Sequence, residues 1–205
     1  MLAILASQNK NKLKEFNGIL EKHNLQVIGR DDTNLPKDDI EENGTTLEAN
    51  SLIKAQAIRD MIVKGGYTEY MDCPVLSDDS GLMVDALDGA PGVYSARYAG
   101  ENPTFDDNNN KLLAELSGVP YEKRTAKFVT VITLIYPDGT TIVATGICPG
   151  HIAEQKQGEG GFGYDPVFIP DGYEKSFAEL GTDFKNTISH RAKALEELEK
   201  KLATS

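Results

Sequence analysis

The sequence predicts an α/β protein with a mixed β-sheet. A short, fully apolar run over residues 2–6 precedes a helical pattern of apolar residues, which is the order of a buried strand and its crossover helix. Two long β-rich runs, 126–136 and 140–147, are joined by a Pro-Asp-Gly turn at 137–139, a strong hairpin signal. Antiparallel strands in an otherwise alternating chain indicate a mixed sheet, and the length suits a single domain over 1–205 that has room for two lobes.

Composition is that of an ordinary globular protein, with 40% hydrophobic and 26% charged residues. No apolar run approaches the ~20 residues that span a bilayer, so we expect no membrane partner. The net charge of −11 argues against general nucleic-acid binding, which needs a basic surface, but leaves room for a nucleotide site. Cys73 and Cys148 form neither a CxxC pair nor a disulfide framework, which predicts a cytoplasmic protein.

The first elements are a strand over 2–6, a helix whose apolar face begins at Leu13, and a second strand over 25–28. No basic region precedes the first apolar run, so we interpret it as a strand and not as a signal peptide. A polar loop over 7–12 joins that strand to the helix, at the sheet edge that ligands favour. Helix N–H groups and Lys12 suit a phosphate there, although the loop lacks P-loop glycines and a solvated, capped helix start explains it equally well.

An acidic segment over 31–43 leads into the next helix. Such a charge run usually forms a solvated face, but glutamates just before a helix are also able to reach a site or complement the helix dipole. Thr45 or Thr46 is expected to cap this helix, with Glu48 completing a capping-box spacing from Thr45. Its apolar positions continue until a glycine pair at 65–66 ends it.

Two adjacent carboxylates, Asp78 and Asp79, stand at the centre of segment 74–98. They follow a short apolar run, and charges near a core are costly unless they are paired or metal-bound. Magnesium takes one or two protein carboxylates and leaves its other positions to water and phosphate. On a strand the two side chains point to opposite faces, so that one of them is mainly structural. A polar turn before Gly81 is the simpler alternative.

The second half adds a helix over 106–116, weakened by three consecutive asparagines, and a glycine-rich loop over 158–166 that enters a strand at 167–169. Glycines allow the backbone to approach a ligand, and an aromatic beside them can stack on a base, whereas a structural turn is the alternative. Ser189 precedes the last helix and is able to cap it.

Six motifs spread over the whole chain resemble those of the inosine triphosphatase family, the pyrophosphatases that clear non-standard purine nucleoside triphosphates. They read Ser7-Gln8-Asn9-x-x-Lys12, Glu41-Glu42-x-Gly44, Leu76-Ser77-Asp78-Asp79-Ser80-Gly81-Leu82, Gly89-Ala90-Pro91-Gly92-Val93-Tyr94-Ser95-Ala96-Arg97-Tyr98, Gly161-Phe162-Gly163-Tyr164-Asp165-Pro166 and Ser189-His190-Arg191. The first motif departs from the family pattern Thr-Gly-Asn-x-x-Lys. Ser7 keeps a hydroxyl there, whereas Gln8 adds bulk in place of glycine.

The resemblance implies an elongated mixed sheet flanked by helices, two lobes with a central cleft, and a homodimer. The implied reaction is magnesium-dependent hydrolysis of the α–β phosphate bond of inosine, deoxyinosine or xanthosine triphosphate. It yields a nucleoside monophosphate and pyrophosphate, and keeps these bases out of DNA and RNA.

The resemblance also assigns roles to individual residues. Asp79 becomes the catalytic base and a metal-linked carboxylate, and Glu42 a metal ligand. A carboxylate beside the metal orients or deprotonates water, and donors such as Arg191 or protonated His190 suit the purine 6-oxygen. The implied substrate-binding residues are Ser7, Gln8, Asn9, Lys10, Asn11, Lys12, Ser80, Phe162, Gly163, Tyr164, Asp165, Lys185, His190 and Arg191.

Two other functions fit part of the pattern. A phosphatase that uses Asp78 or Asp79 as a covalent nucleophile would release orthophosphate through a phosphoaspartyl intermediate. A nucleotide sensor would bind the nucleotide without turnover, and the departure of Gln8 from the family glycine is compatible with this hypothesis. Product analysis separates the two enzymes, and turnover separates both from the sensor.

Overall fold

The computed structural model describes residues 1–7 and 10–204 and divides the chain into two compact units. Unit 1 comprises residues 1–79, 131–145 and 194 onward, and unit 2 comprises 80–130 and 146–193. The prediction of a single domain, and that of a cleft between two lobes, both stay predictions.

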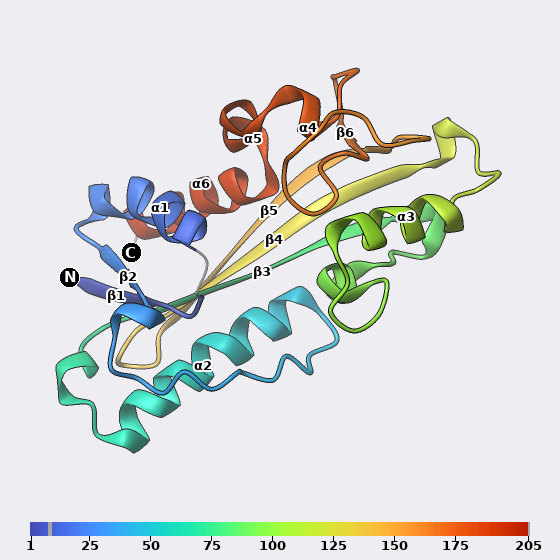
Figure 1. Cartoon of the computed structure of the whole chain (residues 1–205). Coiled ribbons are helices and arrows are strands. Elements are labelled where there is room, and N and C mark those ends of the chain that lie inside the picture. Colours follow the sequence, from blue (N-terminus) through green and yellow to red (C-terminus); the bar gives the residue numbers. More distant parts are fainter. Residues whose placement is uncertain (8–9, 205) are drawn as a thin grey trace. The chain divides into compact units, whose positions relative to one another are not determined.

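The described residues form a six-stranded sheet in the order β2-β1-β3-β4-β5-β6 (Figure 1). Strand β1 pairs in parallel with β2 and β3, whereas β5 and β6 are antiparallel, so the predicted mixed α/β sheet is confirmed. The strands are β1 (Leu2–Leu5), β2 (Gln26–Gly29), β3 (Val75–Val84), β4 (Thr125–Ile135), β5 (Thr141–Ile152) and β6 (Phe168–Pro170).

The α-helices are α1 (Lys10–Leu20), α2 (Leu47–Gly65), α3 (Phe105–Glu115), α4 (Phe177–Leu180), α5 (Thr182–Ile188) and α6 (His190–Ala203). Short 3₁₀ turns lie at Glu21–His23, Arg30–Asp32, Thr68–Tyr70, Asp85–Leu87, Gly92–Arg97 and Tyr121–Lys123. No helix in the described part of the chain combines the length and the apolar character needed to cross a membrane.

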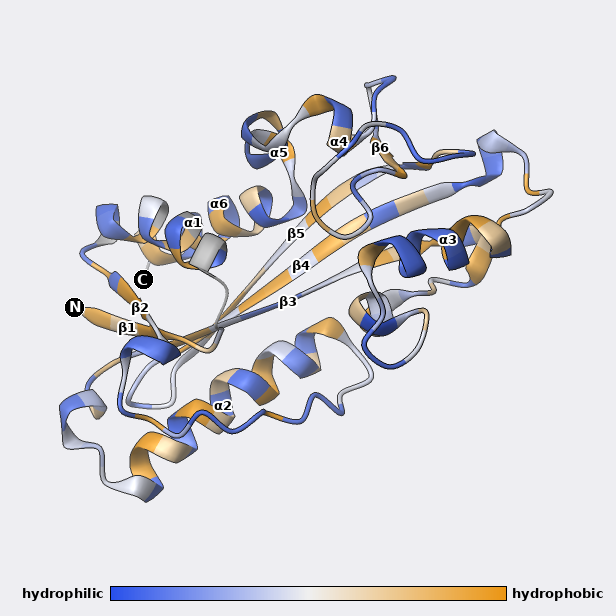
Figure 2. Ribbon diagram, viewed as in Figure 1, coloured by the Kyte–Doolittle hydropathy of each residue, from blue (hydrophilic) through white to orange (hydrophobic). Residues whose placement is uncertain are grey.

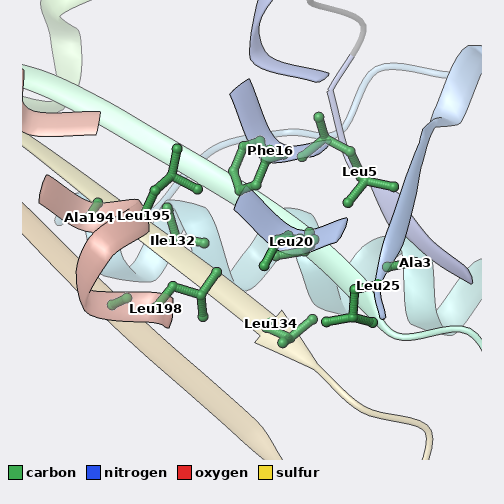
Figure 3. Close-up of a cluster of buried hydrophobic side chains, with 13 residues drawn as sticks. Ala3, Leu5, Phe16, Leu20, Leu25, Ile132, Leu134, Ala194, Leu195 and Leu198 are labelled. Carbon is green, nitrogen blue, oxygen red and sulfur yellow. The ribbon is translucent and has the colours of Figure 1, made fainter. Parts of the chain in front are cut away.

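Unit 1 buries a core on each face of its part of the sheet. On one face, Phe16 and Leu20 of α1 and Leu195 and Leu198 of α6 pack against Ile132 and its neighbours (Figure 3). On the other face, α2 packs its buried isoleucines against the strands. Figure 2 shows β1 and β4 mainly in hydrophobic colours and α2 in alternating ones, as expected for buried strands and an amphipathic helix.

The capping of α2 follows one of the two predicted options. The Thr46 side chain accepts a hydrogen bond from the Ala49 N–H, and Gly66 ends the helix with a left-handed φ of 68°. The capping box expected between Thr45 and Glu48 is wrong, because the helix begins one residue later than that spacing requires.

Strand β3 runs without interruption through both aspartates, so the polar-turn alternative for this segment is wrong. Strand β5 also exceeds its prediction and continues to Ile152 through Pro149 and Gly150. A Cβ on Gly150 would lie 2.3 Å from the Ile169 carbonyl oxygen, so close pairing with β6 requires glycine there. The predicted hairpin turn is confirmed, with Gly139 at φ 88° and the Tyr136 N–H donating to the Thr140 carbonyl.

Unit 2 packs an aromatic core in which Phe168 contacts both Phe128 and Phe177. Helix α3 is capped by a reciprocal Thr104–Asp107 box. The weakening of this helix by its asparagines stays a prediction, and two of them have a structural role, because Asn108 and Asn109 are buried and bind backbone groups of neighbouring loops.

Candidate functional site

Unit 1 contains an open pocket of about 270 Å³ with charged walls. Three cations and three carboxylates contribute to it, so its interior suits a polyanion accompanied by a metal ion more than an apolar ligand. Its lining residues are Ala6, Ser7, Lys12, Arg30, Asp39, Ile40, Glu42, Lys54 and Asp78.

The two adjacent aspartates of β3 meet lysines from different helices. The Lys12 ammonium of α1 lies 2.8 Å from the fully buried Asp78 carboxylate, and the Lys54 ammonium of α2 lies 3.3 Å from Asp79. Because α1 and α2 pack on opposite faces of the sheet, the predicted alternation of the pair is confirmed. Each carboxylate is paired, which explains why the strand continues through both charges.

Lys54 also connects Asp79 to the acidic segment, since its ammonium lies 3.0 Å from the Glu42 carboxylate. Burial raises the pKa of the Asp79 carboxyl, Lys54 opposes this, and Glu42 adds to the rise. Burial alone would lower the pKa of Lys54, but Asp79 and Glu42 outweigh it and raise that pKa. Lys54 therefore remains charged between two carboxylates.

Buried polar groups hold α2 in register with β3 at this point. The Ser77 hydroxyl donates to the Ser51 carbonyl, and the Ser51 hydroxyl donates to Thr133 Oγ1 at 2.9 Å. Asn50 accepts from the Gly44 N–H through Oδ1 at 2.8 Å. These contacts fix the helix turn that carries Lys54.

The oxygen ligands of unit 1 fit magnesium. Glu42 and Asp79 converge on a single cation, the Lys54 ammonium, and are the hard carboxylate donors that magnesium prefers. Within the residues that the structure describes, no group of three or more His, Cys, Asp or Glu side chains is arranged to hold a metal. Magnesium needs only one or two carboxylates, so this finding does not conflict with it.

Unit 2 contains a second pocket of about 130 Å³ with mainly apolar walls. The His190 ring stacks on Phe128 with centroids 4.7 Å apart, and Arg191 lies beside it. Lys185 and the buried Asp165 form an ion pair at 2.7 Å. The lining residues are Ser80, Gly81, Leu82, Ser95, Ala96, Phe105, Asn108, Phe128, Phe162, Gly163, Tyr164, Asp165, Lys185, His190 and Arg191.

The glycine-rich loop forms one wall of the unit 2 pocket. Gly161 has a φ of 82°, and a Cβ there would lie 2.8 Å from the Asp165 Cβ, so this position requires glycine. The Asp165 carboxylate accepts from the Phe162 N–H at 2.8 Å, and the Asn109 amide donates to the Gly163 carbonyl at 2.9 Å. The loop is a well-bonded turn that also lines a pocket, and its contact with a ligand stays a prediction.

Tyr164 and Phe162 differ in exposure although both line this pocket. Burial raises the pKa of Tyr164, and its protonated hydroxyl donates to the Ser95 carbonyl at 2.8 Å. Phe162 is 59% exposed and contacts the Phe105 ring edge-on. Phe162 is therefore the aromatic side chain of the loop that is available to a ligand.

The structure groups the predicted site residues by unit. In unit 1, Ser7, Lys12 and Glu42 share one pocket, and Asp79 joins them through Lys54 without lining it. In unit 2, the eight predicted residues Ser80, Phe162, Gly163, Tyr164, Asp165, Lys185, His190 and Arg191 all line one pocket. Gln8 and Asn9, and the side chains of Lys10 and Asn11, lie outside the described residues.

The Ser189 hydroxyl accepts from the Ala192 N–H, so the predicted cap of the last helix is confirmed.

Sequence reasoning missed several residues of these pockets. Lys54 had a readable signal, because Asn50, Ser51 and Lys54 place a polar stripe on the buried face of α2. Arg30 lines the unit 1 pocket and Phe128 lines the unit 2 pocket, but no local sequence motif predicts either residue.

Fold and pockets together define an α/β protein with one charged, polyanion-sized pocket and one aromatic pocket. The chain matches the model of the Ham1 family over residues 3–201, and it belongs to that family. It is 48% identical to the dITP/XTP pyrophosphatase of Caldanaerobacter subterraneus subsp. tengcongensis over 94% of this chain and 91% of that protein.

Solved structures of two family members share the fold. The Ham1 protein of Staphylococcus aureus is 39% identical with a TM-score of 0.87, covering 100% of this chain and 99% of that one. A HAM1 protein from Coxiella burnetii is 37% identical with a TM-score of 0.88, covering 100% of both chains.

Proposed function

We propose that the protein hydrolyses non-standard purine nucleoside triphosphates to the nucleoside monophosphate and pyrophosphate. The observation that carries this proposal is the joint binding of Glu42 and Asp79 to one Lys54 ammonium in unit 1. It brings a catalytic carboxylate, a second oxygen donor and a phosphate-binding cation into direct contact. Relatives named dITP/XTP pyrophosphatase support the choice of substrate class.

Unit 1 is assigned the phosphates and the water molecule. Lys12 and Lys54 offset phosphate charge, and Ser7 offers a hydroxyl donor. Asp79 accepts a proton from the attacking water, whose oxygen bonds to phosphorus while the phosphoanhydride bond between the α- and β-phosphates breaks and pyrophosphate leaves. Magnesium, when bound to Glu42 and Asp79, supplies charge neutralisation for the departing pyrophosphate.

Unit 2 is assigned the purine base. Its aromatic walls bury a planar ring, and the His190 imidazole is fixed in orientation by its stack on Phe128. The Arg191 guanidinium donates to the 6-oxygen of hypoxanthine or xanthine and leaves the 6-amino group of adenine facing a donor. A pocket built on such matched hydrogen bonds discriminates strongly against the mismatched base.

Magnesium dependence, a homodimeric assembly and a cytoplasmic location complete the proposal. The carboxylate donors of unit 1 support the metal. The assembly and the location are supported only by the family resemblance and by the cysteine pattern.

The test is to incubate the purified protein and magnesium with inosine, xanthosine, adenosine and guanosine triphosphates in parallel and to identify the products by chromatography. We expect inosine monophosphate and pyrophosphate from the inosine substrate, little product from adenosine or guanosine triphosphate, and a strongly reduced rate from the Asp79→Asn protein. Orthophosphate with a nucleoside diphosphate would instead support the covalent phosphatase. Tight binding without turnover would support the sensor.

A further inference from the structure

Arg30 is a buried arginine of the unit 1 pocket that neither the motifs nor the proposed chemistry explains. It begins the 3₁₀ turn Arg30–Asp32 directly after β2, is 5% exposed, and lines the pocket together with Lys12 and Lys54. Its Nε donates to the Pro36 carbonyl at 2.8 Å, and its Nη2 donates to the same carbonyl and to that of Asp38. The guanidinium is therefore held rigidly before any ligand arrives.

The charge of Arg30 is not offset in the way that the other two cations are. Lys12 is paired with Asp78, and Lys54 with Glu42 and Asp79. No carboxylate of the described chain lies within ion-pair distance of Arg30, and its Nη1 makes no hydrogen bond to any described residue. A buried cation without a counter-ion is costly, and an anion in the pocket would remove that cost.

Arg124 in unit 2 shows how this fold satisfies a purely structural arginine. It is also 5% exposed, but its Nε, Nη1 and Nη2 donate to the carbonyls of Val119, Ala153 and Leu116, each at 2.9 Å. Arg124 lines neither of the two pockets. Arg30 differs in both respects, because its Nη1 makes no hydrogen bond within the described part of the chain and because it lines a pocket.

We propose that Arg30 is a phosphate-binding residue whose Nη1 donates to the pyrophosphate portion of the substrate and retains the pyrophosphate product. A guanidinium is planar and always charged, so a face that is anchored on backbone carbonyls leaves the remaining donor aimed in a fixed direction. This inference rests on the proposed function and adds a residue to its phosphate end.

The first test measures binding of inorganic pyrophosphate with magnesium to the full chain by calorimetry. Arg30→Met is expected to weaken binding about tenfold or more, because a charge-assisted hydrogen bond is lost. Arg30→Lys is expected to fall between Arg30→Met and the unaltered protein. Lys37→Met is the matched control, since Lys37 donates to the Arg30 and Thr33 carbonyls of the same turn but does not line the pocket.

A second test uses the unaltered protein, so that a folding defect in Arg30→Met cannot obscure the result. The guanidinium NMR signals of Arg30 and Arg124 are followed while magnesium pyrophosphate is added. We expect the Arg30 signal to shift to saturation and the Arg124 signal to stay.

Three results would overturn the inference. They are an unmoved Arg30 signal at saturation, equal pyrophosphate affinity of a folded Arg30→Met protein, and an equal loss in Lys37→Met. If the unaltered protein releases pyrophosphate from inosine triphosphate in any of these cases, only the role of Arg30 fails. If it releases none, the proposed function itself fails.

Discussion

The unit 1 pocket is lined by lysines, an arginine and carboxylates, whereas the unit 2 pocket is lined by phenylalanines, a tyrosine and a stacked histidine. In unit 1 four of the six charged lining residues are held by ion pairs, and in unit 2 lining residues are held by ring contacts and by hydrogen bonds to the backbone. The proposed function accounts for this difference, because phosphates need charge and a base needs planar apolar walls with a few aimed donors.

This contrast separates two kinds of kinetic defect. A change in the unit 1 pocket should affect every nucleoside triphosphate alike, since the phosphates are common to all of them. A change in the unit 2 pocket should alter the ranking of bases, because only the base differs between substrates.

The largest effect is expected from Asp79→Asn, which removes the proposed base while keeping the size of the side chain. We expect kcat to fall on the order of a thousandfold for inosine and xanthosine triphosphates, with their ratio unchanged. Steady-state rates with both substrates measure this, and Asp72→Asn at an exposed position serves as the control. Normal turnover in Asp79→Asn would exclude Asp79 as the base.

A smaller loss is expected from Lys54→Met, which leaves Glu42 and Asp79 without their shared cation. We expect kcat/KM to fall roughly thirtyfold for all substrates, since hydrogen bonds to buried charges are lost. Lys64→Met on the same helix is the control, because that lysine is exposed and pairs with Asp60. A loss confined to inosine triphosphate would contradict the assignment of unit 1 to phosphates.

Arg191→Met tests the unit 2 assignment. We expect the preference for inosine over adenosine triphosphate in kcat/KM to fall about tenfold, with the affinity for magnesium pyrophosphate unchanged. Competition assays with both nucleotides measure the preference, and exposed Lys193→Met on the same helix should leave it intact. An equal loss of kcat/KM for both nucleotides would contradict the proposed contact of Arg191 with the base and would instead indicate a contact with the phosphates.

The smallest effects come from the matched helix caps, Thr46 in unit 1 and Thr104 in unit 2. Each Thr→Ala change is expected to lower the free energy of unfolding by about 1 kcal/mol, because a helix N–H loses its side-chain acceptor. Urea titrations of both variants measure this. An unchanged unfolding curve for either variant would show that the cap does not contribute.

Local patterns were sufficient to predict the hairpin, because turn chemistry acts over a few residues. The continuous strand β3 was not predicted, since a polar turn explained Asp78 and Asp79 more simply, and their alternation was expected only if they lay on a strand. The short helices α4 and α5 had no such signal, since they contain too few residues to display a helical period. The motifs likewise led to both pockets, since each motif is a continuous stretch of chain.

Contacts between distant residues could not be predicted in this way. Lys54 meets partners 12 and 25 residues away, and only the packing of α2 on the sheet brings them together. The role inferred for Arg30 depends on which guanidinium nitrogens donate to the carbonyls of segment 36–38, and no residue pattern encodes this.

The alternation along β3 also limits how the gene can change during evolution. Inserting or deleting one residue within 75–77 would turn Asp78 and Asp79 to the wrong faces, so that each met the other's helix. A substitution in this segment alters one side chain, whereas an insertion or deletion disrupts both ion pairs, Lys12–Asp78 and Lys54–Asp79, at once. Length variation among descendants of this gene should therefore collect at turns such as 137–139 and spare the strand.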